Sequence, residues 1–368
     1  MNAGEFDIYA GKRVLVTGHT GFKGAWLCEW LLGLGAEVHG WALPPVVPSL
    51  FTSLNHIQRL NHRILDLQHL VELKGPMAEL RPDFIFHLAA QPLVRLSYCQ
   101  PVLTFSTNVM GTAHVLEAVR LANFPCSIVV VTTDKCYEND GRERSFRETD
   151  PLGGHDPYSA SKAAAEIVIA AYRDSFFANG TPVALASARA GNVVGGGDWA
   201  DDRLVPDCVR ALRAGRPIAV RNPHYTRPWQ HVLESLCGYL LLGAKLEEAR
   251  EVESPELAAL AGAFNFGPPP DEQRNVGELV EEVLRHWPGT WVPTPPKEPL
   301  PEAPRLSLAI DKAREVLGWE PRWDFEETVA RTMAWYVEFA NRVEGWSEPE
   351  MIDVTQAQIA AYMEAMTI

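Results

Sequence analysis

The chain has 368 residues, 46% of them hydrophobic and 22% charged, which excludes a wholly disordered protein and suggests about two domains. Its 33 Lys and Arg against 47 Asp and Glu give a net charge of −14, and no basic cluster offsets it, so nucleic acids and anionic membranes are poor partners. The six cysteines form no CxxC pair and show no metal-ligand spacing, which argues against a bound metal such as zinc and against a disulfide framework.

The N-terminus shows no sign of export. Residues 1–7 are acidic and lack the apolar stretch of a signal peptide, and no apolar run of the sequence is long enough to cross a membrane. We therefore expect a cytoplasmic protein with reduced cysteines.

Short apolar strands alternate with helical stretches over the first two-thirds of the chain. The strands are apolar on both faces rather than alternating, which suits a parallel sheet covered by helices on each side. The expected fold is α/β, a doubly wound, mostly parallel sheet of the Rossmann type. The expected strands are 13–17, 37–41, 63–65, 84–88, 127–132 and 183–188, and the expected helices are 22–34, 70–80, 103–121 and 158–177.

After about Gly195 this alternation gives way to loops rich in Pro and Gly. We divide the chain into a first domain over residues 1–190, to which residues 228–262 return, and a smaller α/β domain over residues 191–345. Residues 346–368 hold four acids and no Lys or Arg, and we expect an acidic C-terminal tail that includes a peripheral helix.

A glycine-rich turn joins the first strand to the first helix. Gly18, Gly21 and Gly24 are spaced as GxxGxxG, and Phe22 and Lys23 lie between them. One glycine permits the tight turn, a second lets the backbone approach a pyrophosphate, and a third allows the helix to pack closely on the strand, while the helix N-terminus offers free N–H groups. The turn therefore predicts a dinucleotide cofactor. Lys23 either contacts the pyrophosphate or points to solvent.

The loop after the second strand does not distinguish NAD from NADP. An acid about 20 residues beyond the glycines normally binds the ribose 2′-hydroxyl of NAD, but Gly40-Trp41-Ala42-Leu43 holds neither an acid nor an Arg. Asp66, just after the third strand, is placed to accept a hydrogen bond from the adenine amino group. The alternative is that Asp66 caps the N-terminus of the next helix.

Tyr158 and Lys162 stand one turn apart on an expected helix, so they share a face. An ammonium group beside a phenol favours the phenolate, and lowering the phenol pKa by about three units requires roughly 4 kcal/mol. We expect Tyr158 to be the general base for a substrate alcohol as hydride leaves its carbon, and Lys162 to hold a ribose hydroxyl of a nicotinamide cofactor. Because YxxxK is frequent by chance, the alternative is a solvated pair on a helix.

Together these features resemble the extended short-chain dehydrogenases/reductases, over residues 12–341. The resemblance rests on the glycines, His87-Leu88-Ala89-Ala90, Asn108, Thr132-Thr133 and the Tyr158/Lys162 pair. It implies a dinucleotide-binding domain over residues 1–190, with NAD as cofactor, and a nucleotide-sugar-binding domain over residues 191–345. The cofactor contacts that it implies are Gly18, Gly21, Phe22, Lys23, Gly24, Asp66, Leu67, Ala89, Ala90, Gln91, Asn108, Thr132, Tyr158 and Lys162.

Asp134 and Lys135, directly after Thr133, suit a second reaction. A sugar 4-epimerase needs only the phenol and the cofactor. Once C4 of a hexose is a ketone, the C5 hydrogen is acidified, so a lysine can remove it while a protonated Asp gives its proton to the departing C6 hydroxyl. Water is then lost across C5–C6 and hydride returns to C6. The alternative is that Asp134 and Lys135 form only a surface ion pair.

Four long segments resemble the CDP-glucose 4,6-dehydratases, namely residues 132–139, 189–199, 202–207 and 227–232. The dTDP-glucose relatives carry an acid where Lys135 stands. The resemblance implies CDP-glucose as substrate, with Thr133 bonded to the sugar O4 and arginines bound to the diphosphate. The implied catalytic residues are Thr133, Asp134, Lys135, Tyr158 and Lys162, and the implied substrate contacts are Thr133, Asn192, Arg203, Leu204 and Arg227.

Two other functions remain open. One is a 4,6-dehydratase or 4-epimerase acting on a dTDP-, UDP- or GDP-linked sugar, and the other is a non-catalytic protein that senses a dinucleotide.

The resemblance also implies a homodimer or homotetramer paired through helices 103–121 and 158–177, with Leu116, Val119, Ile167 and Ala171 as candidate contacts. The alternative for these four side chains is burial within one chain.

Overall fold

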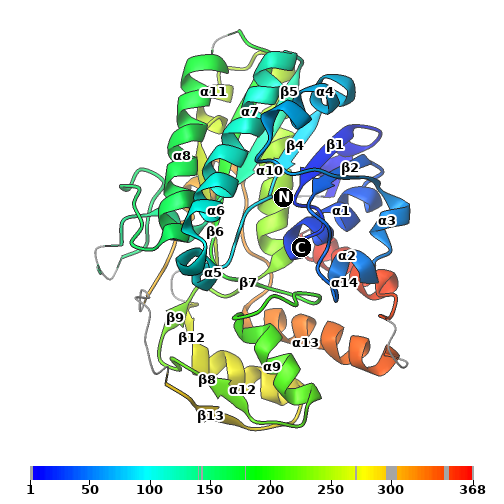
Figure 1. The fold of residues 1–368 in the computed structure, drawn as a ribbon, viewed down its shortest axis with the longest axis vertical. Coiled ribbons are helices and arrows are strands. Elements are labelled where there is room, and N and C mark those ends of the chain that lie inside the picture. Colours follow the sequence, from blue (N-terminus) through cyan, green and yellow to red (C-terminus); the bar gives the residue numbers. More distant parts are fainter. Residues whose placement is uncertain are drawn as a thin grey trace.

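The computed structural model describes residues 3–139, 141, 144–178, 180–269, 272–295, 305–343 and 348–366. One lobe is built around a large sheet, and a second lobe of short strands and helices lies below it (Figure 1). The chain passes repeatedly between the two lobes, so each contains segments that are distant in sequence.

Seven parallel strands form the central sheet, in the order β11-β6-β5-β4-β1-β2-β3. The order reverses between β1 and β4, which opens a crevice at the carboxyl ends of the strands. The expected doubly wound parallel sheet is confirmed, and each expected strand is present with its ends displaced by at most two residues. The strands are β1 Arg13–Thr17, β2 Glu37–Ala42, β3 Asn61–Ile64, β4 Phe84–His87, β5 Cys126–Val131, β6 Val183–Ala190 and β11 Ala263–Phe266.

The side chains of the central strands alternate between two cores, whereas those of the edge strand β3 are exposed or half-buried. Val129 of β5 packs in the core that contains α1 (Phe22–Gly33) and α10 (Val232–Glu251). Its neighbours Ile128 and Val130 pack in the opposite core with α4 (Leu70–Leu80), α7 (Gly111–Ala122) and α8 (Pro157–Phe176). Burial on both faces is why the strands read as apolar runs.

The expected helix over 103–121 is present as a helical segment over residues 101–122, but it is not one continuous α-helix. The segment forms α6 (Pro101–Phe105), a π-helical turn η2 (Ser106–Met110) and then α7. Within the π turn, the buried Asn108 donates from Nδ2 to the backbone oxygen of Gln91 at 3.1 Å and to the hydroxyl of Ser161 at 2.8 Å. A π turn inserts one residue into a helix and so re-aims its side chains, which sequence periodicity does not register.

The second lobe is organised by short strand pairs and three longer helices. The pairs are β7 (Val193–Val194) with β10 (Gln230–His231), β8 (Ile218–Val220) with β13 (Trp291–Pro293), and β9 (Thr226–Arg227) with β12 (Arg274–Asn275). The helices are α9 (Leu204–Arg213), α12 (Val276–His286) and α13 (Phe325–Arg342).

The remaining short elements of the chain are η1 Ala3–Tyr9, α2 Leu50–Ser53, α3 His56–Arg59, α5 Val94–Cys99, η3 Asp134–Cys136, α11 Leu257–Leu260 and η4 Ala313–Leu317.

The C-terminal helix α14 (Ile352–Ala365) joins the two lobes. Its Tyr362 is fully buried and packs edge-on against Trp30 of α1, with ring centroids 5.7 Å apart. Gln358 donates from Nε2 to the backbone oxygen of Arg331 on α13 at 2.8 Å. Residues 346, 347, 367 and 368 of the expected tail lie outside the described residues.

Candidate active site

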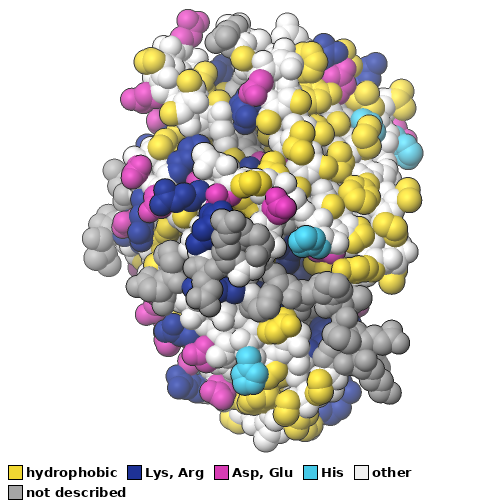
Figure 2. Space-filling model, turned by 90° about the vertical axis from the view of Figure 1, so that its left-hand side faces the viewer, with side chains coloured by type: hydrophobic (Ala, Val, Ile, Leu, Met, Phe, Trp, Pro, Cys, Tyr) yellow, Lys and Arg dark blue, Asp and Glu magenta, His cyan; other side chains and the backbone are white. Residues whose placement is uncertain are grey.

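A cavity of about 980 Å³ lies between the lobes at the carboxyl edge of the sheet. Its wall contains the residues that follow the strands: Gly18 after β1, Leu43 after β2, Leu65 after β3, Ala89 after β4 and Gly191 after β6. On the face shown in Figure 2, Lys and Arg side chains gather at mid-height, where the two lobes meet. The predicted site residues that line the cavity are Gly18, Gly21, Phe22, Lys23, Gly24, Asp66, Leu67, Ala89, Ala90, Thr132, Thr133, Asp134, Lys135, Tyr158, Lys162, Asn192, Arg203, Leu204 and Arg227.

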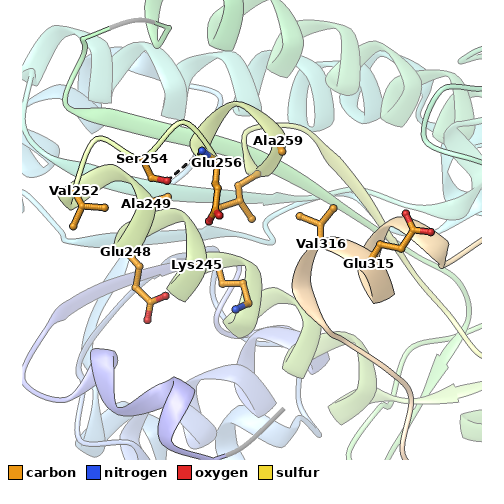
Figure 3. Close-up of a pocket in the computed structure, with 10 residues that line it drawn as sticks. Lys245, Glu248, Ala249, Val252, Ser254, Glu256, Ala259, Glu315 and Val316 are labelled. Atoms are coloured by element: carbon orange, nitrogen blue, oxygen red, sulfur yellow. Dashed lines mark hydrogen bonds between the residues drawn. The ribbon is translucent and has the colours of Figure 1, made fainter.

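A second cavity, of about 500 Å³, is formed by α10, α11 and η4 (Figure 3). Its charged side chains are Lys245, Glu248, Glu256 and Glu315. None of the predicted site residues lines it. We therefore assign the candidate active site to the larger cavity.

The glycine turn leaves no room for side chains. Gly18 has a φ of 76°, and a Cβ there would lie 2.7 Å from the backbone of Ala89. A Cβ at Gly24 would lie 2.2 Å from the backbone oxygen of Gly18. Helix α1 starts after Gly21, which supplies no side-chain cap, so the first N–H groups of the helix are available to a ligand. This cradle fits a pyrophosphate.

Two histidines lie beside the end of β2. The ring of His19 fills the space over Gly40, where a Cβ would come within 2.4 Å of it, and its Nε2 lies 2.6 Å from Nδ1 of His62. Burial, followed by the neighbouring His62, lowers the pKa of His19 to about 3. The His19 ring is therefore neutral at physiological pH.

Asp66 lines the cavity next to the glycine turn. Its Oδ1 accepts from the backbone N–H of Gln68 at 3.0 Å, whereas α4 begins at Leu70 with His69 as its N-cap. The alternative prediction of a helix cap is therefore wrong for Asp66.

Lys23 turns inward rather than to solvent. Its Nζ donates to the hydroxyl of Tyr239 on α10 at 2.9 Å. Burial and the nearby cations of Arg203 and Lys162 lower the pKa of Lys23 to about 7. The alternative prediction that Lys23 points to solvent is wrong, because the first turn of α1 directs the side chain at α10.

Tyr158 and Lys162 lie on the first two turns of α8, which Asp156 caps by accepting from the N–H of Ser159 at 3.0 Å. Lys162 donates from Nζ to the backbone oxygen of Val131 at 3.1 Å, and burial lowers its pKa to about 8. Burial raises the pKa of Tyr158 to about 12, although a hydrogen bond with Thr133 opposes this. The predicted lowering of the Tyr158 pKa is therefore not found, because desolvation of the phenolate outweighs the hydrogen bond with Thr133 and the nearby cation of Arg203.

Asp134 and Lys135 form the short helical turn η3, which Thr133 caps. Asp134 accepts at Oδ1 from the Thr133 hydroxyl at 3.0 Å, and Lys135 Nζ lies 3.8 Å from the same oxygen. The second oxygen, Oδ2, is buried and has no hydrogen-bond partner among the described residues. An unpartnered carboxylate oxygen is costly to bury. The alternative of a surface ion pair is therefore wrong for Asp134, whose side chain is only 2% exposed.

Apart from Thr133, the predicted substrate contacts come from the chain beyond β6. Arg203 donates to Asp198 at 2.9 Å, and Leu204 begins α9 directly after it. Arg227 donates to the backbone oxygen of Thr226 at 2.8 Å. Asn192 presents a buried Oδ1 that no described residue hydrogen-bonds.

Gln91 and Asn108 do not line the cavity. Asn108 Oδ1 accepts from the backbone N–H of Gln91 at 2.8 Å, and the Gln91 amide donates to Thr104 at 2.9 Å and to the backbone oxygen of Leu93 at 3.1 Å. These two side chains thus support the wall behind Ala89 and Ala90.

Among the cavity residues that sequence reasoning missed are Arg95, Arg221 and Tyr225. Arg221 donates to Asp202 at 3.1 Å, and Arg95 lies 3.5 Å from the same carboxylate oxygen. Because Arg95 belongs to α5 and Asp202 to the second lobe, this cluster crosses between the lobes. No spacing in the sequence marks these residues as a group.

No group of three or more His, Cys, Asp or Glu side chains within the described ranges is arranged to hold a metal ion. Over the same residues, no helix combines the length and the apolar character that crossing a membrane requires.

Comparisons with known proteins match nearly the whole chain. The family model described as GDP-mannose 4,6 dehydratase matches residues 15–332. The CDP-glucose 4,6-dehydratase of Salmonella typhimurium is 43% identical over 369 residues, which cover 98% of this chain and 99% of that protein.

Solved structures share the fold. A UDP-glucose 4-epimerase of Thermus thermophilus, solved with NAD, is 26% identical with a TM-score of 0.71, covering 88% of this chain and 99% of that one. A dTDP-glucose 4,6-dehydratase of Streptomyces venezuelae, also solved with NAD, has a TM-score of 0.77 at 24% identity, covering 89% and 98%.

Proposed function

Since the chain belongs to the GDP-mannose 4,6-dehydratase family, we propose that it is a lyase that converts CDP-glucose to CDP-4-dehydro-6-deoxyglucose and water. The observation that carries the proposal is the buried, unpartnered Oδ2 of Asp134, in the wall that also holds Lys135 and Tyr158. An epimerase needs no acid at this position. The choice of CDP-glucose is supported by the 43% identical relative, which spans the same length.

We propose NAD as the resident cofactor, as in the Thermus thermophilus epimerase structure. Bound NAD supplies an acceptor for the hydride of C4 and a donor of hydride to C6. The turn of Gly18, Gly21 and Gly24 would hold its pyrophosphate, and Asp66 its adenine. Lys162 would hold a ribose hydroxyl, because its ammonium lies at the cavity wall beside Tyr158.

The proposed proton transfers use four side chains of this wall. Tyr158 takes the proton of the 4-hydroxyl, and Thr133 hydrogen-bonds the same sugar oxygen. Lys135 removes the C5 proton, and Asp134 gives a proton to the C6 hydroxyl, which leaves as water. As hydride returns to C6, Lys135 gives its proton back to C5, and the proton taken up by Tyr158 restores Asp134. Across one cycle C4 is oxidised, C6 is reduced and the C6–O bond breaks, so the reaction consumes no external oxidant.

We assign the nucleotide sugar to residues 191–345, and the cofactor to residues 1–190 together with the returning segment 228–262. Arg203 and Arg227 suit a diphosphate because a guanidinium can bind two oxygens at once. Asn192 offers a further polar group, and Leu204 an apolar contact beside Arg203.

The decisive test is incubation of the protein with NAD and CDP-glucose, followed by mass analysis of the sugar. We expect a 4-keto-6-deoxy product, and deuterium placed on C4 should reappear in the new methyl group. Turnover of dTDP-, UDP- or GDP-glucose in place of CDP-glucose would contradict the substrate. A product that keeps every hydroxyl would indicate a 4-epimerase, and no turnover of any sugar would favour a dinucleotide sensor.

We also propose a homo-oligomer paired through α6, η2 and α8. The prediction that Leu116 and Val119 contact a second subunit is wrong, because both side chains are fully buried in a core of the same chain. Ile167 and Ala171 remain candidates because they are exposed. Hydrophobic side chains gather over the upper right of the face shown in Figure 2. The exposed apolar side chains of α6, η2 and α8 include Val102, Phe105, Met110 and Phe176. Sedimentation as a monomer at micromolar concentration would contradict this proposal.

We place the enzyme in the cytoplasm. The six cysteines, all within the described residues, form no disulfide, which suits a reducing compartment. Formation of a disulfide in protein isolated from cells under thiol-blocking conditions would contradict the assignment.

A further inference from the structure

We propose that the buried ion pair of Glu166 and Arg189 is a positioning element that holds the two ends of the segment carrying Asp134 and Lys135. This inference rests on the proposed function, since it assigns the pair to the elimination step. Glu166 lies on α8, one turn beyond Lys162, and Arg189 lies near the end of β6. Neither residue lines the cavity.

Glu166 anchors the start of the segment. Its Oε1 accepts from the hydroxyl of Thr132, the residue between β5 and Thr133. Its Oε2 accepts from Arg189 Nη2 at 2.7 Å and from the hydroxyl of Ser187 at 2.8 Å. The side chains of Glu166 and Arg189 are 3% and 4% exposed, so these charge-assisted bonds act away from solvent.

Arg189 anchors the far end of the same segment. Its Nη1 donates to the hydroxyl of Tyr137 at 2.8 Å, and that hydroxyl donates in turn to Oδ1 of Asn265 on β11 at 2.7 Å. The Tyr137 ring stacks on Phe146 at 5.1 Å with an interplanar angle of 8°. One ion pair thus reaches both Thr132 and Tyr137, the two residues that flank the segment 133–136.

The path of the segment depends on its ends because the hydrogen bonds made by its own backbone N–H groups are long. The backbone N–H groups of Lys135 and Cys136 donate to Thr133 at 3.4 Å each. A stronger bond, from Gly153 N–H to the Cys136 oxygen at 2.9 Å, secures only the far end. At the near end, next to Asp134, the backbone N–H of Thr132 donates to the backbone oxygen of Ala188 at 2.9 Å, and the Thr132 hydroxyl adds the tether to Glu166 on α8.

Misplacement of a reacting group by about 1 Å costs roughly a hundredfold in rate. A buried ion pair is by itself weak support for stability, because desolvation of its charges offsets their attraction. Its value here lies in fixing the positions of Thr132 and Tyr137 relative to α8, which carries Tyr158. Asp134 and Lys135, the acid and base of the elimination, are thereby held at fixed positions relative to Tyr158, the base of the oxidation.

The test compares two hydroxyl deletions that remove the same kind of bond to the same carboxylate. Thr132→Val removes the tether to the segment, whereas Ser187→Ala removes the bond from the β6 strand and serves as the matched control. Thr132→Ser, which keeps a hydroxyl, is the rescue variant. Tyr137→Phe releases the far end.

The first measurement is amide hydrogen exchange of residues 132–139 in the full-length protein. We expect Thr132→Val to speed exchange about tenfold, the effect of losing one buried hydrogen bond, and Ser187→Ala to leave it unchanged within about twofold. Unchanged exchange in Thr132→Val, or an equal effect of Ser187→Ala, would overturn the proposal.

The second measurement is turnover of CDP-glucose with the absorbance of reduced cofactor followed throughout. Thr132→Val should lower kcat about tenfold or more with KM and the NAD dissociation constant unchanged within about twofold. Reduced cofactor should accumulate, because oxidation proceeds and elimination lags. Thr132→Ser should restore the wild-type behaviour, and Tyr137→Phe should show a smaller loss of the same kind.

A fall in kcat without accumulation of reduced cofactor would overturn the assignment to the elimination step. A change confined to the NAD dissociation constant would make Thr132 a cofactor contact instead. A wild-type protein that forms no dehydrated product would overturn the proposed function, and hydrogen exchange alone would then decide whether the ion pair holds the segment.

Discussion

Glu234 is a buried carboxyl group whose protonation should control how stability varies with pH. It lies on α10, where Oε1 accepts from the backbone N–H groups of Arg322 and Trp323 at 3.0 and 2.8 Å. Its Oε2 accepts from the hydroxyl of Tyr362 on α14 at 2.5 Å. Burial raises the pKa of Glu234 from 4.5 to about 7, and these hydrogen bonds oppose the rise only in part.

The size of the effect follows from the two pKa values. A rise of about 2.5 units corresponds to about 3 kcal/mol, at roughly 1.4 kcal/mol per unit. Because the folded-state pKa lies above the unfolded one, the folded protein holds the proton more tightly. The stabilisation is therefore fully present below about pH 4.5 and is lost as the pH rises through about 7.

The assay is urea unfolding of the wild type and of Glu234→Gln between pH 5 and 8. The amide resembles the protonated carboxyl and does not titrate, so the variant should not lose stability as the pH rises. The free energy of unfolding of Glu234→Gln, relative to that of the wild type, should therefore increase by about 2 to 3 kcal/mol between pH 5 and pH 8. Glu315→Gln, at an exposed position, controls for the removal of one charge. A difference between Glu234→Gln and the wild type that stays constant with pH would refute the reasoning.

Three further predictions concern the active site. Tyr158→Phe should lower kcat by about 10² to 10⁴ with the circular dichroism spectrum unchanged, and full activity would contradict its role as a base. Asp134→Asn should form reduced cofactor from CDP-glucose but release little dehydrated product, because the amide has no acidic proton to give; product at the wild-type rate would exclude Asp134 as the acid. Gly24→Ala should weaken NAD binding in a titration, because its Cβ would lie 2.2 Å from the Gly18 oxygen, whereas Gly33→Ala, with nothing within 4 Å of its Cβ, should bind NAD as the wild type does.

Much of the active site could be predicted from the spacing of residues within short motifs. The glycine turn, the Tyr158/Lys162 pair and the triplet from Thr133 to Lys135 are each contained within a few residues, so their geometry follows from the turn or helix that they occupy. The topology of a parallel sheet then brings the ends of distant strands to one edge. This is why the predicted residues other than Gln91 and Asn108 line a single cavity although they extend from Gly18 to Arg227.

The spacing of Tyr158 and Lys162 did not predict the direction in which the pKa of Tyr158 shifts. A cation one turn away suggested a lowered pKa for Tyr158, but burial raises it to about 12. The ammonium of Lys162 donates instead to the backbone oxygen of Val131. Burial depends on every element that packs around a group, and no short motif encodes it.

By itself, the sequence determined the parallel sheet, since strands that are apolar on both faces can be buried only between two layers of helices. Only the tertiary structure decided that Lys23 meets Tyr239, and that Arg189 joins Glu166 to Tyr137. Lys23 and Tyr239 lie 216 residues apart, and Arg189 is 23 and 52 residues from its two partners. Such contacts leave no periodic trace along the chain, because they arise where packed elements cross rather than within any one of them.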